Sequence, residues 1–328
     1  MNTPQSSGIV RIARSGPPNV LHYQLETLPQ PGPGEVLLHQ KAIGVNFLDV
    51  FYRNGTFPLA AYPAPIGVEA AGLVAGVGPD VTGIAVGDRV AYQTKELGAY
   101  AENRVLAARD LFKLPADISF AQAAAVLVKG LTVHMLLHQG HALKAGEVVL
   151  IHAMTGGVGT LLSEWARSLG ATVIGTVGSA AKKDLAQGRG FAHVINLQAE
   201  DFAAEVRALT HGQGLDAVYD GIGESTFQQS VALVKEGGSA VLYGWSSGMP
   251  VIDQELLAQR KIHFVRPALK NYLPEREKMD QAIAELFDLV RNGTLNVQQP
   301  TVYALAQAAT AHTDLEARKT TGSIILQP

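Results

Sequence analysis

A glycine-rich turn between two apolar strands constrains the fold of this chain more than any other feature. The strand Val148–Ile151 leads into Gly156-Gly157-Val158-Gly159, and a second strand follows at Thr172–Val177. The helix between them, near residues 158–169, carries regularly spaced apolar residues. Such a turn presents unpaired amides at the positive end of a helix dipole, and its glycines let the backbone approach a phosphate. In this context of strand, turn and helix, the pattern predicts a dinucleotide-binding unit.

Composition excludes several classes of protein. The chain has 328 residues, 47% of them hydrophobic, which favours two globular domains. It has no cysteine, so disulfides, iron–sulfur ligation, thiolate zinc sites and cysteine nucleophiles are excluded. Its net charge is −3 and no basic stripe is present, which argues against nucleic acid and anionic membranes as partners. We find no signal peptide and no stretch of about 18 apolar residues, so we expect a cytoplasmic protein.

The pattern of expected secondary structure differs between two parts of the chain. Residues 1 to about 118 hold short β-prone runs between Gly and Pro turns, which is typical of a small barrel-like β domain. From Glu147 onward strands and helices alternate, which predicts a parallel sheet with right-handed crossovers. The strands of this sheet are expected near 148–153, 171–177, 193–196, 215–220, 238–243 and 262–265, and its helices near 158–169, 180–188, 199–209 and 225–234.

The last 60 or so residues are too few for an independent domain. They contain a predicted helix from Glu275 to Val290, a strand near Tyr303, a helix near 305–317 and a final strand in the sequence SIIL. We expect this segment to fold back on the first domain.

The end of the second strand indicates which nicotinamide dinucleotide is bound. Enzymes that use NAD commonly place an acidic residue there to bind the ribose hydroxyls. Here Gly178 and Ser179 occupy that region, and Lys182 and Lys183 follow one helical turn later. A missing carboxylate and an added cation favour a 2′-phosphate, hence NADP(H) over NAD(H). The alternative is that both lysines are solvated helix residues.

Three further patterns have competing interpretations. His134 and His138 have the i, i+4 spacing of a metal pair but lack the Glu of a zincin motif, so a position on a helix face or beside the cofactor is the better interpretation. Gly244-Trp245-Ser246-Ser247-Gly248 matches a nucleophile elbow, yet no helix follows it directly, which argues against a serine nucleophile. Asp216 and Asp220 flank an apolar strand, and Asp220 either contacts a ligand at the strand end or caps the next helix.

Motifs along the whole chain carry a family resemblance. The segments are KAIGVNFLDVFYRNG, GVEAAGLV, GDRVAY, LGAY, KGLTV, HAMTGGVG, VYDGIG, SSG after a strand, and RPAL. In these the chain resembles the quinone oxidoreductase, or zeta-crystallin-like, branch of the medium-chain dehydrogenase/reductase superfamily. The resemblance implies an α/β fold in which a GroES-like β-rich catalytic domain accompanies a doubly wound Rossmann domain. It places the catalytic domain at 1–125 and 268–328, the NADPH-binding domain at 126–267, and a homodimer contact near the sheet segments 241–243 and 262–265.

Zinc-dependent alcohol dehydrogenases of the same superfamily carry an early Cys ligand and a Gly-His-Glu motif. Here Gly67-Val68-Glu69 replaces that motif and no cysteine exists, so we expect no catalytic zinc. Alcohol oxidation needs a metal or base to remove a proton, whereas a quinone or enone accepts hydride directly when the nicotinamide carbon lies within about 3.5 Å.

The resemblance also assigns residues to the two halves of the site. For the acceptor pocket and catalysis it implies Asn46, Phe51, Tyr52 and Thr132, with Asn46 and Thr132 also touching the cofactor. For NADPH it implies the set Gly156, Gly157, Val158, Gly178, Ser179, Lys182, Gly221, Ser246, Ser247, Gly248, Val265, Arg266 and Arg318. The competing interpretations are that Phe51 and Tyr52 pack the β domain and that Arg318 forms a surface ion pair.

Three residues depart from the family pattern. Met154 stands where a small residue is usual and is expected to crowd the glycine turn, Phe51 lacks a tyrosine's hydroxyl, and Leu197 replaces a tyrosine near the adenosine. The favoured function is an NADPH-dependent, zinc-free quinone reductase with the acceptor in the interdomain cleft. The alternatives are an enone or alkenal double-bond reductase and a non-catalytic NADPH-binding or RNA-binding protein.

Overall fold

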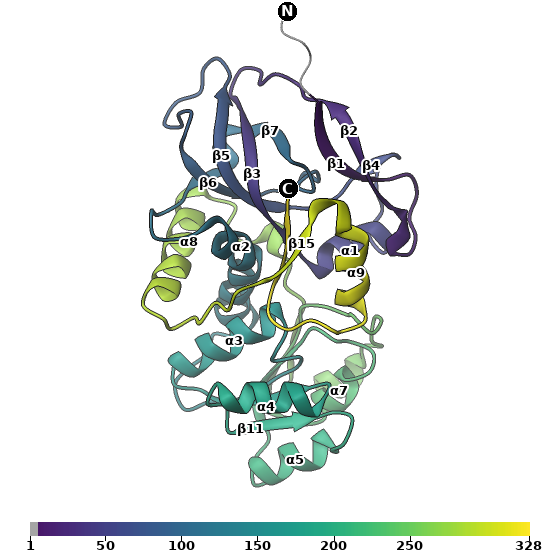
Figure 1. Ribbon diagram of the computed structural model, residues 1–328. Coiled ribbons are helices and arrows are strands. Elements are labelled where there is room, and N and C mark those ends of the chain that lie inside the picture. The colour runs from purple at the N-terminus through teal and green to yellow at the C-terminus, as the bar shows by residue number, and fades with distance from the viewer. Residues whose placement is uncertain (1–5) are drawn as a thin grey trace, which may run out of the picture. The chain divides into compact units, whose positions relative to one another are not determined.

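The computed structural model describes residues 6–328, and the chain divides into two compact units. Unit 1 comprises Met1–Val128 and Val297–Pro328, and unit 2 comprises Lys129–Asn296. Figure 1 shows the course of the chain through both units. The predicted boundaries of 1–125, 126–267 and 268–328 therefore need a correction, because residues 268–296 belong to unit 2.

Helix packing explains that correction. Helix α8 (Arg276–Arg291) buries an apolar face that includes Ala282, Ile283, Leu286 and Phe287. A Cβ on Gly130, in helix α2 (Phe120–Met135), would lie 2.3 Å from Cδ1 of Leu286. Helix α8 thus rests directly on the backbone of α2 and belongs to unit 2, a partner choice that the apolar pattern of 275–290 did not reveal.

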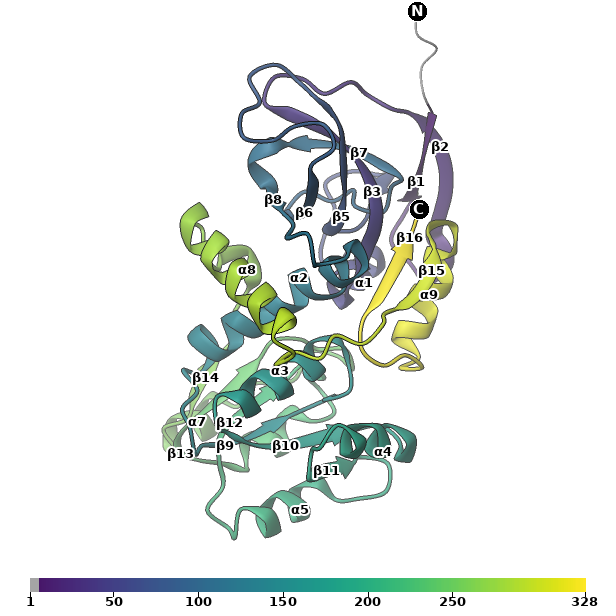
Figure 2. The same cartoon turned by 60° about the vertical axis from the view of Figure 1, so that its left-hand side comes forward.

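Unit 2 is built on a six-stranded parallel sheet in the order β11-β10-β9-β12-β13-β14. The strands are β9 (Val148–Ile151), β10 (Thr172–Val177), β11 (His193–Asn196), β12 (Leu215–Asp220), β13 (Val234–Leu242) and β14 (His263–Val265). The helices α3 (Gly157–Ser168) and α5 (Phe202–Leu209) lie on opposite faces of this sheet (Figure 2). The order reverses between β9 and β12, so the predicted doubly wound Rossmann fold is confirmed.

The same order corrects one detail of the predicted dimer contact. Strand β14 is an outer edge of the sheet, whereas β13 lies one strand inside, between β12 and β14. Of the two segments expected at the edge, 262–265 is there and 241–243 is not. The other helices of the unit are α4 (Ala180–Gly188), α6 (Phe227–Val231) and α7 (Gln254–Gln259).

Unit 1 is β-rich, as predicted. Its larger sheet has the order β15-β16-β3-β5-β6-β8, with β7 also paired to β3, and a smaller sheet has the order β2-β1-β4. Its strands are β1 (Ser6–Ile12), β2 (Leu21–Thr27), β3 (Glu35–Val45), β4 (Ala64–Pro65), β5 (Glu69–Val77), β6 (Arg89–Gln93), β7 (Asn103–Ala107), β8 (Leu111–Lys113), β15 (Thr301–Ala304) and β16 (Ile324–Gln327). Helices α1 (Phe47–Asn54) and α9 (Ala308–Glu316) belong to this unit.

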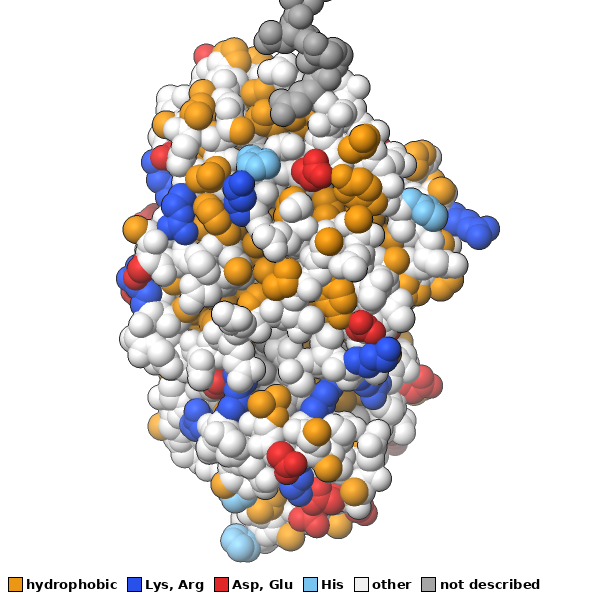
Figure 3. Space-filling model, viewed as in Figure 1, with side chains coloured by type: hydrophobic (Ala, Val, Ile, Leu, Met, Phe, Trp, Pro, Cys, Tyr) orange, Lys and Arg blue, Asp and Glu red, His pale blue; other side chains and the backbone are white. Residues whose placement is uncertain are grey.

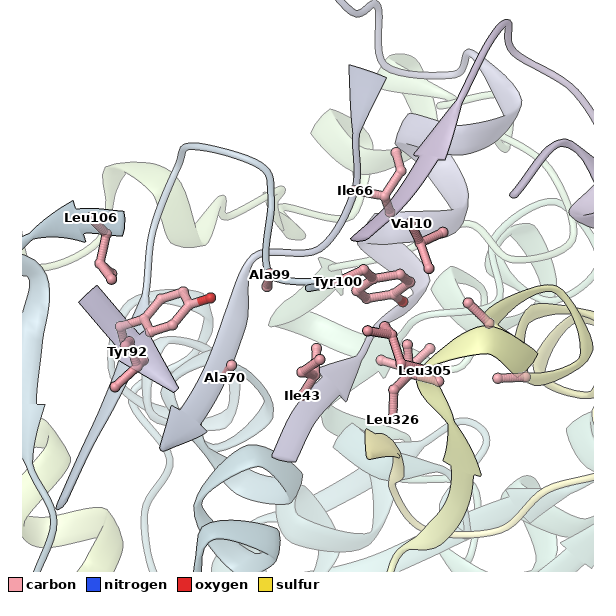
Figure 4. Close-up of a cluster of buried hydrophobic side chains, with 14 of the residues drawn as sticks. Val10, Ile43, Ile66, Ala70, Tyr92, Ala99, Tyr100, Leu106, Leu305 and Leu326 are labelled. Atoms are coloured by element: carbon pink, nitrogen blue, oxygen red, sulfur yellow. The ribbon is translucent and has the colours of Figure 1, made fainter. Parts of the chain in front are cut away.

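The end of the chain completes the core of unit 1. Strand β16 pairs antiparallel with β3, with Ile324 opposite Val45, so the predicted return of the C-terminal segment is confirmed. Figure 4 shows Leu305 and Leu326 from this segment beside Ile43 of β3 and Tyr100. Burying these side chains stabilises the sheet and the returning segment together.

One helix is apolar enough on average to span a membrane, although polar residues interrupt its apolar run. Helix α2 continues through a π-helical turn at Leu136–Gly140, and the resulting helix Phe120–Gly140 is long and apolar enough to cross a membrane. Lys129, Thr132 and His134 interrupt the apolar run in the sequence, so a search for unbroken apolar stretches does not find this helix. The mean hydropathy over the helix is nevertheless high. In the structure 78% of that apolar window is buried inside the protein, so the helix forms part of its core.

Candidate functional site

The glycine turn lies at the carboxyl edge of β9, where α3 begins. Gly156 is the N-cap of α3, so Gly157 and Val158 form the helix's first turn. A Cβ on Gly159 would lie 2.2 Å from the carbonyl oxygen of Ala153, which means that only glycine lets the helix start so close to the strand end. The amides of Gly157 and Val158 therefore stand at a helix N-terminus, the kind of position where a pyrophosphate binds, whereas the Gly156 amide donates to the Ala153 carbonyl at 2.9 Å.

Met154 does not crowd this turn as expected. Its side chain is buried and lies over β10, where a Cβ on Gly175 would meet the Met154 sulfur at 1.9 Å. The Met154 amide donates to the carbonyl of Thr176 at 3.0 Å, which holds the residue against that strand. Gly175 thus makes room for the larger side chain.

The end of β10 has the features expected of a phosphate site. Ser179 caps α4, and its Oγ accepts from the backbone amide of Lys182 at 3.3 Å. Lys183 is ion-paired with Glu200, Nζ to Oε1 at 2.8 Å, so its charge is neutralised. A Cβ on Gly178 would meet no atom within 4 Å, which leaves open space beside the strand end. The open position suits an adenosine 2′-phosphate, because β10 itself ends without a carboxylate and the nearby Glu200 is paired with Lys183. Leu197, half-buried after β11, donates its amide to the carbonyl of Val177 at 2.9 Å.

The loops that follow β12 and β13 are bound to each other. The Ser246 amide donates to the carbonyl of Gly221 at 3.2 Å, and the Ser247 amide donates to that of Ile222 at 2.8 Å. Gly248 has a φ of 120°, a backbone conformation that side chains with a Cβ rarely adopt, so glycine is favoured in this loop. The structure thereby brings Gly221 together with the Ser246-Ser247-Gly248 loop.

Strand β14 adds the remaining predicted pair at the same edge. Val265 is its last residue, and the Arg266 guanidinium stacks over the Trp245 ring at 4.5 Å. Because all six strands are parallel, their carboxyl ends meet at one edge of the sheet. The predicted unit 2 residues of the nucleotide site lie at this edge, except Thr132, which lies half-buried on α2.

Asp216 and Asp220 have structural partners. Asp220 is fully buried, and its Oδ1 accepts from the amides of Ile222 and Gly223 at 2.7 and 2.9 Å. Its Oδ2 accepts from the Thr226 hydroxyl at 2.7 Å. Asp216 accepts from the Val148 amide at 2.9 Å and pairs with Lys235. Asp220 therefore holds the turn that follows β12 and does not cap the next helix, α6, whose N-cap is Thr226. Its contact with a ligand stays a prediction.

The other two patterns are also structural. Ser246, the serine of the nucleophile pattern, donates its amide to the Gly221 carbonyl at 3.2 Å, and α7 begins only at Gln254, so this serine lies in a loop and not on a nucleophile elbow. The rings of His134 and His138 stack at 4.1 Å, and burial lowers the pKa of His134. Within residues 6–328, no three His, Asp or Glu side chains gather as a metal site.

Unit 1 holds Asn46 in a buried polar cluster. Asn46 is the N-cap of α1, its backbone amide donates to Asp49 Oδ2 at 2.8 Å, and its Nδ2 donates to Glu69 Oε1 at 2.7 Å. Glu69 is fully buried and also accepts from the Val128 amide at 2.8 Å. The Glu69 carboxylate therefore orients the side-chain amide of Asn46. In the sequence Glu69 stands out only as part of the Gly67-Val68-Glu69 motif, which did not predict this role.

The remaining predicted residues of unit 1 lie on α1 and after α9. Phe51 is buried between the rings of Phe47 and Phe57 at centroid distances of 5.6 and 5.5 Å, which supports its packing interpretation. Tyr52 is half-buried with its ring 5.5 Å from that of Phe57. Arg318 is exposed, with a φ of 56° at the turn that ends α9. Sequence reasoning also missed α1 itself, whose Asn46 cap and αL Gly55 were its available signals.

Comparison with known proteins gives consistent matches over the chain. Residues 32–116 match the family model described as alcohol dehydrogenase GroES-like domain, and residues 157–288 match the one described as zinc-binding dehydrogenase. The quinone oxidoreductase of Pseudomonas aeruginosa is 43% identical over 322 residues, covering 97% of this chain and 99% of the relative. A 2-haloacrylate reductase of a Burkholderia species is 41% identical over 325 residues, covering 97% of this chain and 98% of the relative.

A solved structure has the same overall fold. The crystal structure of Escherichia coli quinone oxidoreductase complexed with NADPH superposes with a TM-score of 0.94 and 38% identity. The match covers 98% of this chain and 100% of that one. Similarity of this extent covers both units and the carboxyl edge described above.

Proposed function

This chain belongs to the quinone oxidoreductase family of the medium-chain dehydrogenase/reductase superfamily, and from that premise we propose that it is an NADPH-dependent quinone reductase. The observation that carries the proposal is the carboxyl edge of the unit 2 sheet. There a glycine turn at a helix N-terminus stands next to a strand end without a carboxylate, followed by Ser179 and Lys182.

Each part of that edge has a proposed role toward NADPH, which supplies a hydride when bound. The amides of Gly157 and Val158 bind the pyrophosphate, and Gly156, whose own amide donates to the Ala153 carbonyl at 2.9 Å, lets the phosphate approach because it has no side chain. Gly178, Ser179 and Lys182 hold the adenosine 2′-phosphate through backbone, hydroxyl and ammonium groups. The residues assigned to the nicotinamide half are Asn46, Thr132, Gly221, Ser246, Ser247, Gly248, Val265 and Arg266, and Arg318 is assigned to the cofactor from the C-terminal segment.

The acceptor side rests on unit 1. We assign Asn46 and Tyr52 to contact with the acceptor, with Asn46 held in place by Glu69 through the 2.7 Å bond. Phe51 packs between Phe47 and Phe57. Phe51 has no hydroxyl, and the side-chain NH2 of Asn46 already donates a hydrogen bond to Glu69. Few polar groups are therefore available to contact a quinone oxygen. Such a site suits an acceptor that is already electrophilic.

The reaction is proposed to proceed without zinc. The chain has no cysteine, and Val68 stands where the zinc enzymes of the superfamily carry a histidine. The neighbouring Glu69 is already committed to two N–H donors. These residues do not form the Cys and His ligand set that zinc prefers.

The cofactor assignment has a direct test with a matched control on the same helix. Lys182→Ala is expected to raise the Kd for NADPH about 10-fold or more, the equivalent of one charge-assisted hydrogen bond, with little change for NADH. Lys183→Ala is the control, because Lys183 is already paired with Glu200. Fluorescence titration with both nucleotides measures the effect. Equal affinity of the wild type for NADH and NADPH contradicts the assignment.

A second candidate function is reduction of an activated carbon–carbon double bond. The relative that favours it is the 2-haloacrylate reductase at 41% identity, whose named substrate is an enoate. Such a reduction places the hydride on the β-carbon of an enone or enoate instead of on a quinone. Initial rates of NADPH oxidation with a panel of quinones, enones and 2-haloacrylates separate the two. If no quinone is turned over and an enone is, the second candidate replaces the first.

Partner and location belong to the same proposal. On the face shown in Figure 3, basic and acidic side chains of the described residues are interspersed, which supports a small-molecule acceptor over RNA. We propose a cytoplasmic homodimer in which the outer edge of β14 meets a second copy, because an exposed strand edge offers unpaired backbone groups. Sedimentation of the wild type as a dimer at micromolar concentration is the expected result, and a monomer contradicts it.

A further inference from the structure

A fully buried histidine stands directly before the glycine turn. His152 follows β9, has no exposed surface, and uses both ring nitrogens. Its Nδ1 lies 2.8 Å from Thr176 Oγ1 near the end of β10, and its Nε2 lies 2.7 Å from Ser230 Oγ on α6. The ring of Phe202 covers it edge-on at 5.4 Å. Burial lowers the pKa of His152, so the ring is neutral.

The hydrogen bonds around His152 determine its tautomer. Ser230 has one hydroxyl proton, which it donates to the carbonyl of Thr226 at 2.8 Å. Ser230 Oγ can therefore only accept from the imidazole, so Nε2 carries the proton. Nδ1 is then the acceptor, and the Thr176 hydroxyl donates to it. A neutral ring in one tautomer thus joins β9, β10 and α6.

The same cluster reaches the loop after β12. Asp220 Oδ2 lies 3.8 Å from His152 Nε2 and accepts a hydrogen bond from the Thr226 hydroxyl. The backbone carbonyl of Thr226 in turn accepts the hydrogen bond from the Ser230 hydroxyl. The other Asp220 oxygen holds the amides of Ile222 and Gly223. The cluster made of His152, Thr176, Asp220, Thr226 and Ser230, which we call the edge network, therefore touches the three strand ends that carry the glycine turn, the Ser179 cap and the Gly221 loop.

We propose that His152 is a positioning residue that holds the carboxyl ends of β9, β10 and β12 in the arrangement that NADPH binding requires. This inference rests on the proposed function. A nucleotide that spans several loops binds tightly only where those loops are already in place, because otherwise binding must supply the ordering cost. No member of the edge network needs to touch the nucleotide for this effect.

The test compares variants at two fully buried histidines. His152→Leu removes both ring hydrogen bonds from the edge network, and His312→Leu removes an equally buried imidazole from α9 of unit 1. We expect His152→Leu to raise the Kd for NADPH about 10-fold or more, whereas His312→Leu lowers the thermal midpoint and leaves this Kd within about two-fold. Amide exchange of Ile222 and Gly223, followed in parallel, is expected to accelerate only in His152→Leu.

Conservative variants separate positioning from stability. His152→Asn keeps an acceptor for Thr176, and His152→Gln keeps a donor for Ser230, so each is expected to restore part of the affinity. If His152→Leu does not fold, Thr176→Val, which removes the donor with little change in shape, takes its place and is expected to weaken NADPH binding in the same direction. An NADPH Kd unchanged in the folded variants, with a lowered thermal midpoint, overturns the inference. Failure of the wild type to bind NADPH overturns the proposed function instead.

Discussion

At the residue scale, buried polar side chains connect distant segments within unit 1. Tyr100 is fully buried and donates its hydroxyl proton to Asp49 Oδ2 at 3.0 Å. His312 Nε2 lies 2.9 Å from the Tyr100 hydroxyl oxygen and must therefore donate to it. Asp49 also accepts the Asn46 amide. Helix α9 is thus connected to Asn46, the N-cap of α1, through three successive hydrogen bonds.

This arrangement makes stability depend on pH through His312. Burial, with a smaller contribution from the nearby Arg53, lowers the pKa of His312 to about 3, against 6.5 for the free side chain. Below pH 6.5 His312 is protonated in the unfolded chain but stays neutral in the folded chain until the pH approaches about 3. The free energy of unfolding therefore falls as the pH drops from about 6.5 toward about 3. The slope from this group is about 1.4 kcal/mol per pH unit.

Thermal unfolding of wild type and His312→Leu between pH 4 and pH 8 checks this prediction. The variant is less stable at pH 8 because it loses a buried hydrogen bond, but its midpoint is expected to fall less steeply on acidification. Parallel curves for the two proteins contradict the assignment of the pH dependence to His312.

At the element scale, small and large residues are matched between neighbouring segments. The space beside Gly175 in β10 is filled by Met154 from the turn after β9, and Gly159 lets α3 begin beside Ala153. These pairs lie far apart in sequence or in different elements. The turn and the strand therefore constrain each other, and neither residue is free to change alone.

A double-mutant cycle tests the matched pair. Gly175→Ala is expected to destabilise the protein, because its Cβ would overlap the Met154 sulfur, and Met154→Ala is expected to cost about 2–5 kcal/mol as a cavity. The double variant is expected to be destabilised by less than the sum, since the new methyl group occupies part of the space. Urea denaturation measures each free energy of unfolding. Gly178→Ala is the control, because its Cβ meets open space. Strict additivity contradicts the pairing.

At the scale of the whole molecule, the chain leaves unit 1 after Val128 and returns to it at Val297. Its last strand, β16, lies between β15 and β3, so the final residues are an inner strand of the large sheet. Leu326, fully buried there, belongs to the same core as Val10 and Ile43. The fold of unit 1 is complete only when the C-terminus is in place.

The variant Leu326→Ala tests whether the C-terminal strand stabilises unit 1 specifically. We expect a loss of about 2–5 kcal/mol in unit 1, seen as faster amide exchange in β3 and β16. Exchange in β9 and β12 of unit 2 is expected to stay unchanged under the same conditions. Uniformly faster exchange across both units would show that the chain opens as one cooperative body.

Local patterns in the sequence were sufficient for the elements and for the type of cofactor site. Strands such as Glu35–Val45 and Leu215–Asp220, the helix Ala180–Gly188 and the glycine turn follow from residue periodicity and turn chemistry within short windows. Tertiary structure alone decided that α8 rests on Gly130 of α2, that Gly175 receives Met154, and that His152 joins three strand ends. Those outcomes depend on contacts between residues distant along the chain, and a side chain's partner across such a distance leaves no periodic signal in the sequence.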